Sequence, residues 1–127
     1  MTPWNIDRRP MPSGADIDVL CPAQVGPYMR QKIDGSPMNG NSAYVHYSAG
    51  PAAIFVEFAI TSGPRDAHAV LETANGEVGG NLVKAEPAYL TTADGTFFAW
   101  TRAGYYWSAH AQGGPGDLDA FMRAFPF

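Results

Sequence analysis

Residues 96–112 constrain the fold of this chain more than any other segment, because they hold two adjacent runs rich in aromatic and β-favouring residues. The runs 96–102 and 105–112 are separated only by Ala103 and Gly104. This pattern predicts an antiparallel hairpin with a tight turn, in which we expect glycine to supply the unusual backbone angles.

Aromatic residues occupy both alternating positions of this hairpin, so they are predicted on both faces of the sheet. We expect one set to contain Phe98, Trp100, Tyr106, Ser108 and His110, and the other to contain Phe97, Ala99, Tyr105 and Trp107. The strand register decides which set faces the helices. The outward set predicts an aromatic binding patch, with the candidate residues Phe98, Trp100, Tyr105, Tyr106, Trp107 and His110.

Three interpretations of such a patch are open. It could contact a protein partner or a second copy of the chain, or it could bind a flat ligand. Alternatively, strong sheet curvature or the N-terminal segment could cover it. Charged residues make up 16% of the chain, against about 25% in ordinary soluble domains. That scarcity of charge favours burial against a partner.

The 127 residues suit one domain, which we place at 16–127. With a net charge of −4 and scattered basic residues, the chain has no basic stripe, so we expect no nucleic-acid partner. Cys21 is the single cysteine, which rules out an internal disulfide. No apolar run is long enough to span a bilayer, so no membrane insertion is predicted. We expect a cytoplasmic protein, with a secreted protein whose signal was removed as the alternative.

Residues 1–15 are rich in proline, arginine, serine and glycine, and this composition predicts an extended N-terminal arm. Trp4 and Ile6 are unusual in such a segment. We interpret them as contacts with the domain or with a partner, and a disordered tail is the alternative.

The rest of the chain alternates strand and helix signals. Strands are predicted at 28–33, 43–48, 52–61, 87–92 and in the two runs of the 96–112 hairpin. In the third strand, Ile54, Val56, Phe58 and Ile60 share one face, whereas Phe55, Glu57, Ala59 and Thr61 share the other. We expect the first set to face the core. The turn-rich segment between Asp34 and Ser42 is predicted to be a loop.

Two helices begin at similar signals, Gly63-Pro64 and Gly114-Pro115. Asn75-Gly76 is predicted to end the first helix, and Pro126 to end the second. The order β-β-β-α-β-β-β-α therefore predicts an α+β domain, in which a mostly antiparallel sheet has both helices packed on one face.

The two halves of this order, residues 27–76 and 86–126, resemble each other. Apolar residues of the two helices correspond position by position, as do the turns at Ala49-Gly50 and Ala103-Gly104. A duplicated βββα unit explains this likeness. Coincidence of ordinary helix signals explains it too.

The sequence marks no catalytic constellation. His46, His68 and His110 have no ligand-like spacing, so no metal or other cofactor is predicted. Cys21 is interpreted as a small buried hydrophobe. Asp66 and Asp117 are explained by helix N-termini.

We therefore expect a non-catalytic binding or accessory module. It would contact a partner subunit or its own copy through the aromatic sheet face, with Trp4 and Ile6 helping. The alternative is a small-ligand-binding protein or enzyme with a pocket between sheet and helices near His110.

Overall fold

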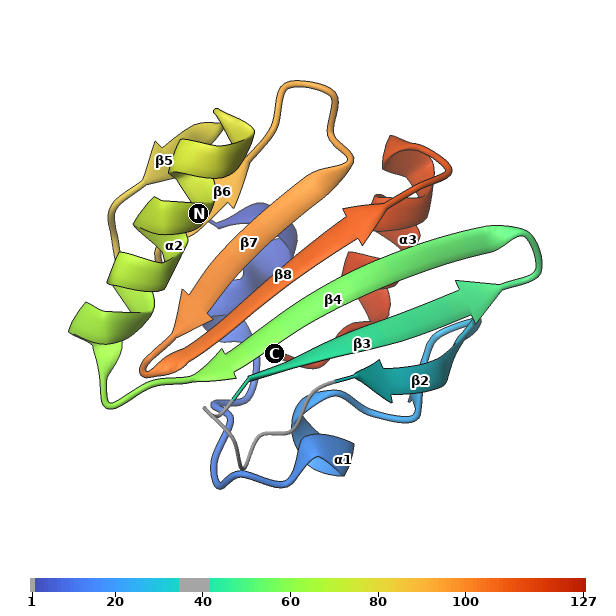
Figure 1. Ribbon diagram of the computed structural model, residues 1–127, viewed down its shortest axis with the longest axis horizontal. Coiled ribbons are helices and arrows are strands. Elements are labelled where there is room, and N and C mark those ends of the chain that lie inside the picture. The colour runs from blue at the N-terminus through green and yellow to red at the C-terminus, as the bar shows by residue number, and fades with distance from the viewer. Residues whose placement is uncertain (1, 35–41) are drawn as a thin grey trace.

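The computed structural model describes residues 2–34 and 42–127, and one twisted antiparallel sheet organises them (Figure 1). Its strands follow the order β1-β2-β3-β4-β8-β7-β6-β5. Their bounds are β1 Gln24–Val25, β2 Tyr28–Asp34, β3 Ser42–Ala49, β4 Ala52–Ile60, β5 Asn81–Val83, β6 Tyr89–Thr91, β7 Phe97–Arg102 and β8 Tyr105–Ala111. The helical elements are η1 Pro3–Arg8, α1 Ile17–Leu20, α2 Pro64–Val78 and α3 Pro115–Ala124.

The α+β class, the antiparallel sheet and the predicted order of strands and helices are confirmed. Two short strands, β1 and β5, extend the sheet at its edges beyond the predicted set. The predicted loop at 35–41 lies outside the described residues.

The register of the central strands determines which side chains share a face. Trp100 lies opposite Trp107, and Trp107 lies opposite Phe58. Because directly opposed residues of an antiparallel pair project to the same side, these three rings line one face. We call it the core face. The predicted grouping of Phe98 and Trp100 with Tyr106 is wrong, because Tyr106 pairs with Thr101 and projects to the opposite face.

The two long helices do not share a face of the sheet. Helix α3 buries Leu118, Phe121 and Met122 in the cluster that contains Trp100 and Trp107. Helix α2 buries Leu71 in a separate cluster with Ala88, Leu90, Ala99 and Tyr106 on the other side. Figure 1 shows α2 in front of the sheet and α3 behind it. The predicted placement of both helices on one face is therefore wrong.

The physical reason lies in the composition of strands β6 to β8. Both alternation sets of this half are apolar, as Ala99 and Tyr106 on one side and Phe98 and Trp107 on the other illustrate. Each side must be removed from water, so each side needs its own cover. Strands β3 and β4 bury their apolar side chains on the core face, whereas their other face stays partly exposed, and α2 makes its main contacts with β5 to β8.

The N-terminal segment also belongs to the core face. Residues Pro3–Arg8 form the short 3-10 element η1, which is kinked at Trp4 and Asn5 (φ 51° and 53°), and not the expected extended arm. Ile6 is fully buried, and the Trp4 ring meets Phe98 edge to face with centroids 4.9 Å apart. The Arg9 guanidinium donates hydrogen bonds of 2.6 Å to the carbonyls of Phe125 and Met122. Trp4 and Ile6 are therefore contacts within the domain.

Two local expectations about glycine are also corrected. Helix α2 continues through Asn75 and Gly76 to Val78, because Gly79 takes the left-handed cap (φ 65°) and donates its N–H to the Asn75 carbonyl. In the central hairpin, Ala103 carries the positive φ (53°). A Cβ on Gly104 would lie 3.0 Å from the Thr61 carbonyl oxygen, so glycine is needed there for close approach.

The predicted duplication is not confirmed. In a duplicated unit, β4 would correspond to its antiparallel neighbour β8. A twofold axis normal to the sheet relates two such strands, and rotation about this axis does not exchange the two faces of the sheet. Both helices would then lie on one face. Helices α2 and α3 lie on opposite faces instead. The similar starts of these helices agree with ordinary helix-start signals, since both have proline in the first turn and an early aspartate.

Candidate functional site

Most residues of the predicted aromatic patch lie in the interior. Phe98, Trp100 and Trp107 are fully buried. They pack in a chain of rings that includes Phe125 and Phe127 from the C-terminal segment. The prediction that these aromatics form an outer surface is therefore wrong. The hydrophobic cost of exposing such large rings makes them the centre of the core.

The other three residues of the predicted aromatic patch do not share one face of the sheet. Tyr105 is partly exposed on the core face, where its hydroxyl donates to the Gly14 carbonyl at 2.7 Å. Tyr106 is buried under α2, and His110 is exposed near the other end of β8. Of the predicted set, only Tyr106 and His110 line the same pocket.

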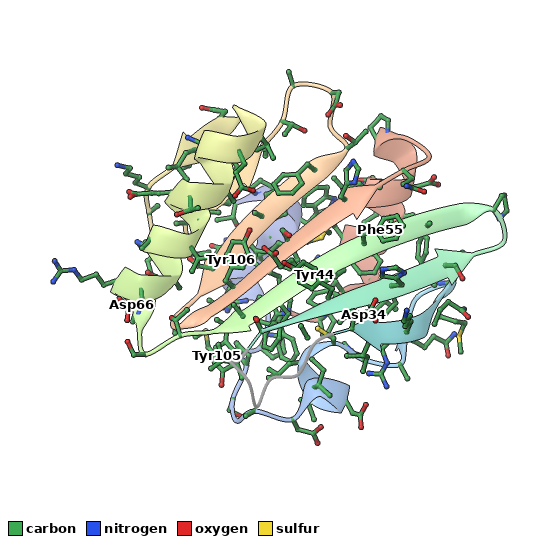
Figure 2. All side chains as sticks on the ribbon, in the orientation of Figure 1. Asp34, Tyr44, Phe55, Asp66, Tyr105 and Tyr106 are labelled. Atoms are coloured by element: carbon green, nitrogen blue, oxygen red, sulfur yellow. The ribbon has the colours of Figure 1, made fainter. Side chains whose placement is uncertain are left out.

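That pocket lies where the end of α2 faces the uncovered half of the sheet. Its volume is about 260 Å³. We call it the α2 groove, and its lining consists of Tyr44, His46, Phe55, Val56, Glu57, Ala74, Glu77, Val78, Phe97, Tyr106, Ser108 and His110. Figure 2 shows Tyr44, Phe55 and Tyr106 on the sheet face that also carries α2. The strands provide the floor, and the last turns of the helix provide one wall.

Strand pairing arranges the floor in two rows across the sheet. One row runs Lys32, His46, Phe55, His110, Phe97, and the next runs Asp34, Tyr44, Glu57, Ser108, Ala99. Neighbours in such rows have their Cβ atoms about 4.5 to 5.5 Å apart, close enough to act on one ligand. The rows therefore bring aromatic, imidazole, hydroxyl and carboxylate groups together from five strands.

The aromatic part of the floor has defined geometry. The rings of His46 and Phe55 meet edge to face, with centroids 4.6 Å apart and an interplanar angle of 89°. Tyr44 is 55% exposed and Val78 is 41% exposed, which is unusual for large apolar or aromatic side chains in this protein. Both line the groove, so a ligand there would cover apolar surface that is now in water.

Two glutamates govern the electrostatics of the groove. The pKa of Tyr44 is raised, first because its hydroxyl hydrogen bonds to Glu57 and then because of the charge of that carboxylate. Burial raises the pKa of Tyr106, and the charges of Glu57 and Glu77 raise it further. Negative potential from two elements, β4 and α2, therefore acts at the same place, and both tyrosines stay neutral hydroxyls at ordinary pH.

Metal-ligating side chains and the single cysteine offer no further reactive site among the described residues. Within the described residues, no cluster of three or more His, Cys, Asp or Glu side chains could hold a metal. Cys21 is fully buried, and burial raises its thiol pKa to about 12, which confirms its interpretation as a buried hydrophobe. None of the described helices is both long and apolar enough to cross a membrane.

Sequence reasoning missed most of the groove. Tyr44, His46, Phe55, Glu57 and Glu77 were not predicted as site residues. The available signal was the alternation in 52–61, which correctly placed Phe55 and Glu57 on the face away from the core. The contribution of α2 had no local signal, because it depends on where the helix packs.

In comparisons with known proteins, the chain matches no family model, no curated protein and no solved structure. The architecture itself defines an antiparallel sheet with a helix on each face and a partly open groove beside α2.

Proposed function

We propose that this protein is a binding module that holds a small ligand in the α2 groove. The observation that carries the proposal is the pocket of about 260 Å³ beside His110, where apolar and polar groups converge from the sheet and α2. Ligand sites are typically concave and largely apolar, with a few placed polar groups. Nearly buried Tyr106 and Ser108 supply hydroxyls at the floor, and Tyr44 and Val78 supply accessible apolar surface.

A bulky substitution at the groove wall should weaken this binding strongly. In Val78→Trp, the larger ring would enter the groove, and we expect ligand affinity to fall about tenfold or more, because a ligand normally buries most of its surface in its pocket. The measurement is amide chemical-shift perturbation by NMR with a mixed set of small probes: phenol, imidazole, benzylammonium and benzoate. Perturbed amides should lie in β3, β4, β8 and the end of α2.

The matched control is Val19→Trp, since Val19 is 49% exposed in α1 and does not line the groove. This variant should bind the probes as the unchanged protein does. Probe-induced shifts that are absent, or that are scattered over other surfaces and insensitive to Val78→Trp, would contradict the proposed function.

A second candidate function is contact with a protein partner or a second copy of the chain. The exposure of Tyr44 favours it, and so does the lack of main contacts between α2 and strands β2 to β4. The contact would use the α2 side of the sheet and not the buried aromatics of the core face.

For self-association, Tyr44→Arg should convert a dimer to a monomer, because it places a charge at the centre of the contact. Light scattering over a concentration series measures this, with Val19→Arg on the exposed surface of α1 as the control. If the unsubstituted protein is a monomer at every concentration, self-association is excluded, and the partner must be a different protein.

A further inference from the structure

We propose that the α2 groove selects small organic cations: an ammonium or guanidinium group carried on a compact apolar body. This inference rests on the proposed binding function and names the ligand class. It follows from three properties of the groove, which are its charge, its aromatic walls and its polar floor.

The charge of the groove is negative. Its lining includes Glu57 and Glu77 and contains no lysine or arginine. In the described part of the chain, no ion pair uses either glutamate. The basic side chains of the rows are His46 and His110, whose imidazoles line the groove, and Lys32, whose Nζ lies 3.2 Å from the carboxylate of Asp34. Among the described residues, the groove therefore offers two carboxylates that form no ion pair with a lysine or arginine.

The two carboxylates act on the same space. Glu57 lies on β4 and Glu77 on α2, and both raise the pKa of Tyr106, which is buried between those elements. A hollow that continues from the groove adds Asp94, together with Thr92 and Thr96. This negative potential would repel a bound anion and stabilise a bound cation.

Aromatic surfaces give the groove selectivity for organic cations. Tyr44, Phe55 and Phe97 line it, and the edge contact from His46 holds the Phe55 ring in a defined orientation. The face of an aromatic ring attracts ammonium and guanidinium groups through its quadrupole, most strongly where water is partly excluded. An alkylated ammonium group binds well where carboxylates lie beside aromatic rings, as they do in this groove. A bare metal ion such as Ca²⁺ or Mg²⁺ instead prefers to be surrounded by oxygen ligands.

The test compares choline with 3,3-dimethylbutan-1-ol, a neutral molecule of nearly the same shape. We expect choline to bind about tenfold or more tightly than the alcohol, since cation–π and charge interactions act on choline alone. NMR titration of the full chain measures both affinities and locates the site. Raising the salt concentration should weaken choline binding and leave the alcohol unchanged.

Isosteric variants test which residues cause the selectivity. Glu57→Gln and Glu77→Gln should each reduce choline affinity several-fold, to about tenfold, without changing the affinity for the alcohol. The matched control is Glu72→Gln. Glu72 also lies on α2, but its carboxylate faces Lys84 at 3.2 Å and it is not part of the groove lining. This control should leave choline affinity within about twofold, as expected for an exposed ion pair.

Two further probes distinguish the source of the cation. Butylammonium represents a free small amine, and the blocked peptide Ac-Ala-Lys-Ala-NH2 represents a lysine side chain of a protein. Tighter binding of the peptide would identify a peptide source, and tighter binding of the free amine would identify a metabolite-like source. Either result supports a cation site.

The outcomes separate this inference from the function on which it rests. Equal affinities for choline and its neutral isostere within the groove would overturn cation selectivity and leave the binding function standing. Tighter binding of benzoate than of benzylammonium would also overturn it. If no probe of any charge perturbs the groove amides, the binding function itself is wrong.

Discussion

Trp107→Ala should lower the free energy of unfolding by about 3 to 5 kcal/mol, the range observed when a large buried aromatic is truncated. Trp107 is fully buried, and its ring lies within 5.4 to 5.9 Å of the rings of Phe58, Trp100, Tyr105, Phe125 and Phe127, measured between centroids. Its indole N–H also donates to the Leu20 carbonyl at 3.1 Å. Truncation would leave a cavity and a buried carbonyl without its donor.

Chemical denaturation measures this loss, and Tyr44→Ala is the matched control. Tyr44 lies on the same sheet but is 55% exposed on the opposite face, so its truncation should change stability by about 0.5 kcal/mol or less. Trp107→Phe should fall between the two, because it keeps a ring and loses the hydrogen bond. A loss below about 1 kcal/mol for Trp107→Ala would be incompatible with its position in the core.

Ile6→Ala should lower the free energy of unfolding by about 2 to 5 kcal/mol, although Ile6 lies in a proline-rich segment near the N-terminus. Ile6 is fully buried in the same cluster as Trp100 and Phe125. Hydrogen bonds hold the neighbouring residues in place. The Trp4 indole N–H donates to Asp119 at 2.9 Å, and Arg9 donates two hydrogen bonds to the end of α3.

The control for Ile6 is Val19→Ala, a truncation of a similar residue that is 49% exposed. It should leave the denaturation midpoint nearly unchanged. If Ile6→Ala also left the denaturation midpoint unchanged, the N-terminal segment would behave as a free tail in solution. That result would refute the packing of η1 against the core face.

The strands were predictable because their signals are local. The alternation in 52–61 and the paired runs around Ala103-Gly104 identify hairpins whose strands meet within a few residues. The two glycine-proline helix starts are local as well. For the candidate site, the same local reasoning named six residues of the central hairpin, of which Tyr106 and His110 line the α2 groove.

The faces of the central hairpin were not predictable from these signals. Both alternation sets are aromatic, so hydrophobicity alone does not distinguish the core face from the α2 face. The deciding contact is the pairing of β4 with β8, which places Phe58 opposite Trp107 across a long sequence separation. A register shift by one residue would exchange the two faces.

The sequence by itself determined six of the strands, the two long helices, the α+β class and the order of these elements, since capping, turn chemistry and alternation act over a few residues. Only the tertiary structure decided that Trp107 is core, that Ile6 completes that core, and that α2 leaves a groove over Glu57 and Phe55. Those outcomes depend on which distant apolar surfaces bury one another, and hydrophobic burial is non-directional, so no local pattern specifies its partners.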